Sequence, residues 1–424
     1  MEIIPTQKSF RSYMFFWSGQ LFSLLGSMVV HFVIIWWIQI ETESPTMLSL
    51  GQFFYFLPML LAMPIAGVLS DKLKRKNIII VVDSLQAYVT IILIILFIYN
   101  VANIWLVLVF IALRSLFQAF HQPTVAAVTP SMVPKEKLSR INGISFLFIG
   151  LIQLIGPAIG ALMLQFFAVK IILWVDVITF FIALIPLLFI NIPIVRDKTQ
   201  TKEKNGFIRD FRIGFSALIA VPGLITLLVM AMFANFLIQP LGTLLPYYVN
   251  VTHGGMAFEY ALITIFLQIG IMGGAVLTTI KKEWKHKIEL TFFGIAFVGV
   301  GYAVLAFIPK GFFYLIGIDL MVMGLVLPII NVIYQTILQT NVAHDKLGRV
   351  TSIDSTLSMV ISPVGSIIAG PVTEIIGIQP LFLICAIATI VLMLSMYFFT
   401  NIRHVEYNGH TTLDSKILEE EIIE

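Results

Sequence analysis

The stretch I-I-L-I-I-L-F-I at residues 91–98 is apolar on every side, and similar hydrophobic runs of about 20 residues recur along the chain. A run of this length crosses a hydrocarbon core of roughly 30 Å as an α-helix that rises about 1.5 Å per residue. A membrane β-barrel instead needs segments of about ten residues that alternate in polarity. The sequence therefore predicts an all-α polytopic membrane protein.

The composition favours the same class. Hydrophobic residues make up 59% of the 424 residues and charged residues 12%, whereas a soluble domain is roughly half apolar and one-quarter charged. The single cysteine, Cys385, has no partner in the chain, which excludes a disulfide framework and a thiolate metal site. The first residues lead into a hydrophobic segment without a cleavage signature, so a retained helix is expected there.

The hydrophobic runs predict twelve transmembrane helices, near 14–39, 46–70, 77–99, 104–131, 139–166, 169–192, 218–249, 257–280, 287–308, 312–341, 349–375 and 379–401. The one long polar stretch between helices falls close to the chain midpoint and is interpreted as a linker. The predicted organisation is an N-terminal six-helix half, a cytoplasmic linker, a C-terminal six-helix half and a cytoplasmic tail, at 1–192, 193–213, 214–402 and 403–424.

The positive charges are distributed unevenly between the two sets of loops. Of the 26 Lys and Arg residues, all but three fall on one side of the predicted arrangement. The exceptions are Lys170 and Lys310 in the opposite loops and Arg114 inside a helix. Because basic loops stay in the cytoplasm, both termini are expected there, with the protein in the plasma or inner membrane.

An internal repeat supports the two halves. The segment P-K-E-K-L-S-R-I-N-G-I-S-F at 134–146 aligns with A-H-D-K-L-G-R-V-T-S-I-D-S at 343–355, and Gly156 then matches Gly365. Both copies enter the fifth helix of their half, so the halves are expected to be parallel repeats of one six-helix unit.

A basic loop, G-V-L-S-D-K-L-K-R-K at 67–76, joins the second and third helices. One interpretation is a simple positive-inside anchor. The loop also resembles the signature G-x-L-A-D-R-x-G-R-K of the major facilitator superfamily, although Lys74 stands where that signature has Gly. The resemblance implies the major facilitator fold, with a conformational latch formed by Gly67, Asp71, Lys72, Arg75, Lys76 and, nearby on the third helix, Asp83.

The fifth helix contains G-L-I-Q-L-I-G-P-A-I-G-A at 150–161. Gly156, Pro157 and Gly160 predict a helix that bends and packs closely. A structural kink alone would explain the pattern. The stretch also resembles the G-x-x-x-G-P-x-x-G motif of the antiporter branch of the superfamily, which implies export.

Arg114 is the one basic residue deep inside a predicted helix, where an unpaired charge costs about 3 kcal/mol or more. Either a buried ion pair or a functional role would explain it, and the superfamily resemblance links it to proton coupling. Polar residues at helical spacing on the first and fourth helices of each half predict a substrate cavity lined by Gln20, Ser27, Gln118, His121, Gln122, Asn235, Gln239, Asn331 and Gln335. Any single pair of them could instead be a hydrogen bond between helices.

A proton carrier needs a buried carboxylate or imidazole. The candidates for proton coupling are Arg114, Asp176, Asp319 and His31, and the sequence does not choose among the last three as the carrier.

Two further segments, 114–124 and 234–249, resemble the macrolide-efflux branch of the superfamily. The resemblance implies a secondary transporter that exports hydrophobic or amphipathic compounds by proton antiport. The alternatives are a lipid or lysolipid flippase, a siderophore exporter and a non-transporting membrane sensor. Neither a phosphate-binding loop nor a catalytic or metal-spaced motif occurs, so an enzyme is not expected. The expected partners are a small hydrophobic substrate, protons and the lipid bilayer, with no cofactor, no metal, no nucleic acid and a monomeric state.

Overall fold

The architecture follows the hydrophobic runs. The computed structural model describes residues 6–193, 207–281 and 284–404. Within these ranges the chain forms helices and no strands, and twelve segments are long and apolar enough to cross a membrane. The predicted all-α fold with twelve spans is confirmed.

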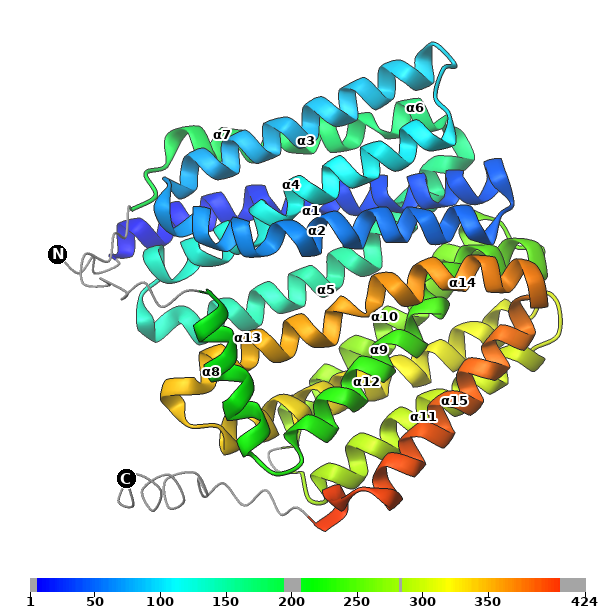
Figure 1. Cartoon of the computed structure of the whole chain (residues 1–424). Helices are drawn as coiled ribbons and strands as arrows, with labels where there is room; N and C mark the ends of the chain where they lie inside the picture. Colours follow the sequence, from blue (N-terminus) through cyan, green and yellow to red (C-terminus); the bar gives the residue numbers. More distant parts are fainter. Residues whose placement is uncertain (1–5, 194–206, 282–283, 405–424) are drawn as a thin grey trace. The chain divides into compact units, whose positions relative to one another are not determined.

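The chain divides into two compact units, Met1–Thr199 with Leu244–Gln268, and Gln200–Thr243 with Ile269–Glu424. The first unit contains α1 (Gln7–Thr42), α2 (Pro45–Lys72), α3 (Arg75–Ile98), α4 (Ile104–Met132), α5 (Lys135–Phe166), α6 (Val169–Ile172), α7 (Trp174–Phe189) and the π-helix η1 (Tyr248–Thr252) (Figure 1). The second unit contains α8 (Phe207–Ala220), α11 (Lys287–Phe307), α12 (Phe313–Asn341), α13 (His344–Val360), α14 (Ser362–Ile376), α15 (Ile378–Phe399) and the 3₁₀ helix η2 (Asn401–His404).

Two helices, α9 (Leu224–Tyr247) and α10 (Ala257–Ile280), contribute residues to both units. The predicted halves, 1–192 and 214–402, stay a prediction. Residues 194–206 of the predicted linker and 405–424 of the predicted tail lie outside the described residues.

Short polar residues fix where several spans begin. At the start of α1 the Thr6 side chain accepts from the Ser9 backbone N–H, and the Ser9 hydroxyl oxygen accepts from the Thr6 backbone N–H. The Asn103 side chain caps α4 in the same way, by accepting from the Leu106 N–H. These bonds satisfy backbone donors that a helix N-terminus leaves free, which stabilises each start by about 1 kcal/mol.

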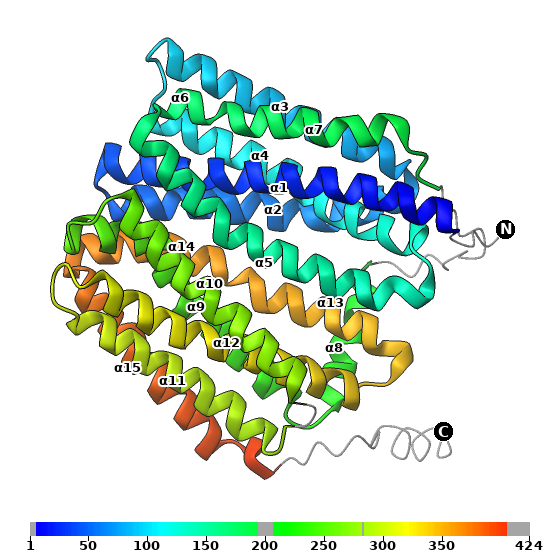
Figure 2. The same ribbon diagram turned by 180° about the vertical axis from the view of Figure 1, so that it is seen from behind.

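In the first unit, α1 packs against α5 and α7, and Figure 2 shows α5 running beside it. The contact with α5 depends on glycine. A methyl group added at Gly156 would lie 2.8 Å from Met28 Cβ, and one added at Gly160 would lie 2.8 Å from Phe32 Cδ1. The helix with the predicted bend motif is therefore held against α1 at positions that have no side chain.

In the second unit, α11 packs against α12 and α15. The close glycine contact of the first unit has a counterpart here. A methyl group at Gly365 on α14 would lie 2.8 Å from the backbone oxygen of Phe236 on α9. Gly156 meets the first span of the chain and Gly365 meets the seventh span. The two aligned glycines thus serve the same contact in each unit.

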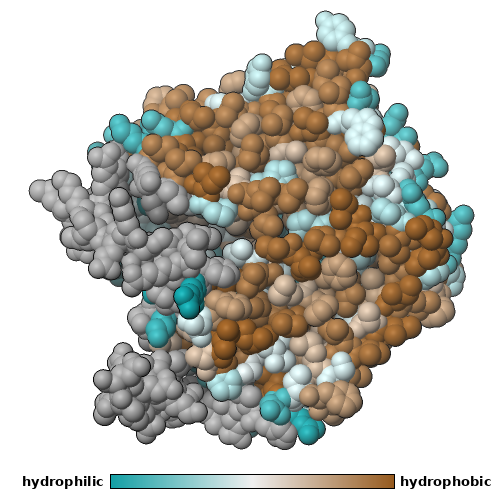
Figure 3. Space-filling view, in the orientation of Figure 1, coloured by the Kyte–Doolittle hydropathy of each residue, from teal (hydrophilic) through white to brown (hydrophobic). Residues whose placement is uncertain are grey.

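Large apolar side chains cover the outer surface of the spans, as Figure 3 shows for one face. Phe399, Ile375 and Phe189 are 80% or more exposed. An apolar surface of this extent is suited to contact with lipid, and in water it would cause aggregation of the protein. The single cysteine, Cys385 on α15, is buried instead.

Three details differ from the helix boundaries predicted from the sequence. The region before the seventh span forms a separate helix, α8, so the span itself begins at Leu224 and not near residue 218. The eleventh span is interrupted at Ile361, directly before Ser362 and Pro363. Pro363 has no backbone N–H to continue the hydrogen-bond ladder, which explains a break at this point. The sixth span is likewise divided into α6 and α7.

Candidate functional site

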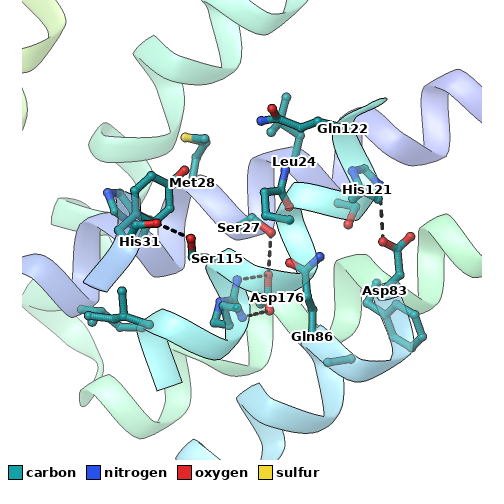
Figure 4. A pocket seen from close by; sticks show the side chains of 18 of the residues that line it. Leu24, Ser27, Met28, His31, Asp83, Gln86, Ser115, His121, Gln122 and Asp176 are labelled. Atoms are coloured by element: carbon teal, nitrogen blue, oxygen red, sulfur yellow. Dashed lines mark hydrogen bonds and ion pairs between the residues drawn. The ribbon is translucent and has the colours of Figure 1, made fainter. Parts of the chain in front are cut away.

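A polar cavity of about 270 Å³ lies inside the first unit, between α1, α2, α3, α4 and α7. It collects several residues that the sequence singled out on different helices: Gln20, Ser27, His31, Asp83, Arg114, Gln118, His121, Gln122 and Asp176 (Figure 4). The predicted polar faces of the first and fourth spans therefore meet in one cavity.

Arg114 on α4 and Asp176 on α7 form an ion pair in this cavity. Arg114 Nη1 lies 2.6 Å from Asp176 Oδ2, and Nη2 lies 3.2 Å from Oδ1. The two side chains are only 14% and 7% exposed. A guanidinium and a carboxylate matched at two points balance their charges and fix their relative orientation.

Hydroxyl groups complete the surroundings of the Asp176 carboxylate. Ser27 on α1 donates to Oδ1 at 2.9 Å, and Thr90 on α3 donates to Oδ2 at 2.8 Å. Arg114 Nη1 also donates to the Thr90 hydroxyl. Each carboxylate oxygen therefore accepts two hydrogen bonds, and one acidic side chain joins four helices.

A second charged pair lies in the same cavity. His121 Nε2 on α4 is 3.3 Å from Asp83 Oδ1 on α3 and 2.9 Å from Gln20 Oε1 on α1. Asp83 is 7% exposed. The sequence grouped Asp83 with the latch loop, but its side chain lies in the cavity and faces His121.

His31 lines the cavity next to an aromatic neighbour. Its ring centroid lies 5.3 Å from that of Tyr55 on α2. The Ser115 hydroxyl on α4 donates to the backbone oxygen of Tyr55 and so ties α4 to α2 at this level. His31 thus stands beside the Arg114 ion pair without forming part of it.

The predicted site residues of the second unit do not line this cavity. Asn235 donates to the Ser358 backbone oxygen at 3.2 Å, and Gln239 lies beside Gly365. Asn331 and Gln335 are exposed. Asp319 on α12 is partly buried, and its Oδ2 has no hydrogen-bond partner among the described residues.

Two basic residues of the latch loop donate to backbone carbonyl groups, Arg75 within α4 and Lys76 at the end of α7. Arg75 Nη1 donates to the Ala127 oxygen at 2.8 Å, and Lys76 Nζ donates to the Leu188 and Ile190 oxygens at 3.1 and 2.8 Å. A cation at a helix C-terminus compensates the partial negative charge there. No described atom would lie within 4 Å of a methyl group at Gly67. The side chains of Asp71 and Lys72 lie outside the described part of the chain.

Sequence reasoning missed Thr90 and Gln86, which contribute to the cavity from α3. A signal for them exists in the sequence. Asp83, Gln86 and Thr90 follow one another at spacings of three and four residues, which places them on one helix face. The third span therefore carries a polar stripe of the same kind as the first and fourth.

Several relatives of this chain are efflux proteins. Macrolide efflux protein A of Streptococcus pyogenes is 28% identical over 368 residues, which cover 87% of this chain and 91% of that protein. Macrolide efflux protein A of Enterococcus faecalis is 28% identical over 310 residues, which cover 73% and 96%. Multidrug efflux pump Tap of Mycobacterium tuberculosis (strain ATCC 25618 / H37Rv) is 25% identical over 360 residues, which cover 83% and 84%.

Several solved structures with the same fold are transporters. A D-xylose-proton symporter matches with a TM-score of 0.70 at 11% identity, over 94% of this chain and 100% of that one. The nucleoside transporter NupG matches with a TM-score of 0.67 at 12% identity, over 90% and 100%. The model of the Major Facilitator Superfamily itself matches residues 16–365. The twelve spans, the shared fold and this match place the chain in the Major Facilitator Superfamily, as a transporter and not an enzyme.

Proposed function

We propose that this chain exports hydrophobic or amphipathic compounds of the macrolide or multidrug type in exchange for protons. The named efflux relatives, at 25 to 28% identity over most of the chain, support this substrate class. We further propose that both termini lie in the cytoplasm, because the basic residues collect in one set of loops. The proposed state in the cell membrane is a monomer.

The polar cavity carries the proposal. Burying Arg114, Asp176, Asp83 and His121 within membrane-spanning helices is costly, and lipid provides no partners for them. Ionisable side chains in such positions are typical of pathways for water, ions and substrate. Apolar side chains such as Leu24, Met28 and Phe180 line the same cavity, which suits a ligand with both polar and apolar parts.

Alternating access is the proposed mechanism. The substrate cavity and the coupling residues Arg114, Asp176, Asp319 and His31 would be exposed in turn to each side of the membrane. The basic latch loop would stabilise one of the two conformations, since Arg75 binds a backbone carbonyl of α4 and Lys76 binds one at the end of α7.

The test is accumulation of erythromycin and of a fluorescent dye, ethidium, in cells with and without the protein. Export predicts lower accumulation in expressing cells, and collapse of the proton gradient by a protonophore should abolish the difference. Equal accumulation of both compounds would refute the proposal. Transfer of a labelled lysolipid between leaflets, without efflux of either compound, would indicate a flippase instead.

A further inference from the structure

The pair of Asp83 and His121 differs in kind from the pair of Arg114 and Asp176. Around His121, two oxygens approach the same nitrogen, Nε2: Asp83 Oδ1 at 3.3 Å and Gln20 Oε1 at 2.9 Å. Both oxygens are acceptors, which favours the tautomer of His121 with its hydrogen on Nε2. The ring can then take up a further proton only at Nδ1.

The charge balance of the two pairs is also different. A guanidinium stays protonated in proteins, so Arg114 neutralises Asp176 permanently. The neutral imidazole of His121 leaves the buried Asp83 carboxylate uncompensated, and its Oδ2 has no hydrogen-bond partner among the described residues. A net negative charge in a site of low dielectric constant is unfavourable, and one added proton removes it.

Other groups in the cavity do not supply that missing charge. The remaining titratable or charged side chains that line it are His31 on α1, Tyr55 on α2, Arg114 on α4 and Asp176 on α7. Arg114 and Asp176 neutralise each other in their ion pair. At the start of α3, Arg75 and Lys76 bind backbone oxygens of α4 and α7.

We propose that Asp83 and His121 together hold the proton that is exchanged for substrate, with Gln20 positioning the imidazole. This inference rests on the proposed proton-coupled export. The proton binds at His121 Nδ1 or at Asp83 Oδ2, and either position preserves the hydrogen bond of Nε2 with Gln20 and its contact with Asp83 Oδ1. This assignment takes the place of Asp176, Asp319 and His31 as candidate proton carriers. The ion pair of Arg114 and Asp176 holds the neighbouring helices and keeps both its charges through the cycle.

The experiment measures two quantities on purified protein. The first is exchange of labelled erythromycin across proteoliposomes with no proton gradient. The second is proton release when erythromycin binds to the protein in weakly buffered detergent solution with a pH indicator. An exchanger cannot hold substrate and proton at once, so the wild-type protein should release protons on binding.

Asp83→Asn and His121→Gln should reduce proton release per bound erythromycin to background. Exchange should continue in both, at a lower rate than in the wild-type protein, because both side chains line the cavity. Asp354→Asn is the matched control, because it removes another buried membrane carboxylate, one that accepts from the Tyr334 hydroxyl in the second unit. The control should keep both activities.

Retained exchange shows that a variant is folded. If Asp83→Asn alone loses exchange, proton release by His121→Gln tests the inference. Proton release that persists in both variants would overturn the inference, and so would loss of exchange in both. A wild-type protein that neither exchanges erythromycin nor releases protons would instead refute the proposed function.

Discussion

Arg114 Nη1 and Nη2 meet the two oxygens of Asp176 at 2.6 and 3.2 Å, and this single contact joins α4 to α7 inside the first unit. Ser27 and Thr90 extend it to α1 and α3. Four helices therefore depend on one carboxylate for their polar contacts, and removing either charge leaves the other without compensation.

We expect Arg114→Gln and Asp176→Asn each to destabilise the protein by about 3–5 kcal/mol, because each leaves a buried charge unpaired. The double variant leaves none and should be more stable than either single variant. Unfolding of the purified proteins in detergent, analysed as a double-mutant cycle, gives the coupling energy. Additive losses in the double variant would contradict the ion pair.

The close contact of α5 with α1 predicts a strong dependence on glycine. Gly156→Ala and Gly160→Ala should each lower stability by about 1–3 kcal/mol, since the new methyl groups would lie 2.8 Å from Met28 and Phe32 atoms. Gly143→Ala on the same helix is the control, because no described atom lies within 4 Å of its added methyl group. Thermal unfolding should separate the control from the other two; three equal midpoints would rule out the packing argument.

A second pair of glycines permits contact between backbones in the second unit. Methyl groups at Gly270 and Gly274 on α10 would overlap with the backbone oxygens of Met321 and Leu325 on α12. Backbone atoms cannot rotate away, so we expect Gly270→Ala and Gly274→Ala to reduce the yield of folded protein severely. Gly273→Ala, between them, meets no described atom within 4 Å and should behave like wild type in size-exclusion chromatography. A normal yield of Gly270→Ala would disprove the close approach.

The hydroxyl of Tyr302 forms hydrogen bonds with the backbone of α9 close to Pro240. It donates to the Ile238 oxygen at 2.9 Å and accepts from the Leu241 N–H at 2.9 Å. Tyr302→Phe leaves that buried N–H unpaired and should cost about 1–3 kcal/mol. The comparison is Tyr397→Phe, whose hydroxyl has no hydrogen bond to a described residue; chemical unfolding that affects both variants equally would contradict the role of Tyr302.

Much of the fold could be predicted from the sequence because the bilayer imposes a simple length requirement on apolar runs. The predicted ranges 104–131 and 257–280 correspond to α4 and α10 within one residue. The predicted helix boundaries are wrong where one helix has both a polar and an apolar face. The predicted linker ends at residue 213 and the predicted seventh span begins near 218, whereas Phe207–Ala220 forms one amphipathic helix across both boundaries. Hydrophobicity alone does not distinguish these cases.

The cavity was predictable only in part. The polar spacing on the first and fourth spans singles out Gln20, Ser27 and His121, and these side chains line one cavity with Arg114. It did not reveal which partner Arg114 takes, because Asp176 lies 62 residues away on another span and only tertiary packing brings them together. The same limit applies to Asp83, which sequence proximity associated with the loop at 67–76.

The burial of Cys385, 4% exposed on α15, gives the native chain a practical property. A water-soluble maleimide should leave this thiol untouched in the folded protein, so new cysteines can be placed in an otherwise unmodified background. Spin labels attached at the exposed positions Tyr99 in the first unit and Tyr314 in the second would then report the separation of the units by pulsed electron resonance. A distance distribution that changes with pH or with added drug would follow the working cycle directly.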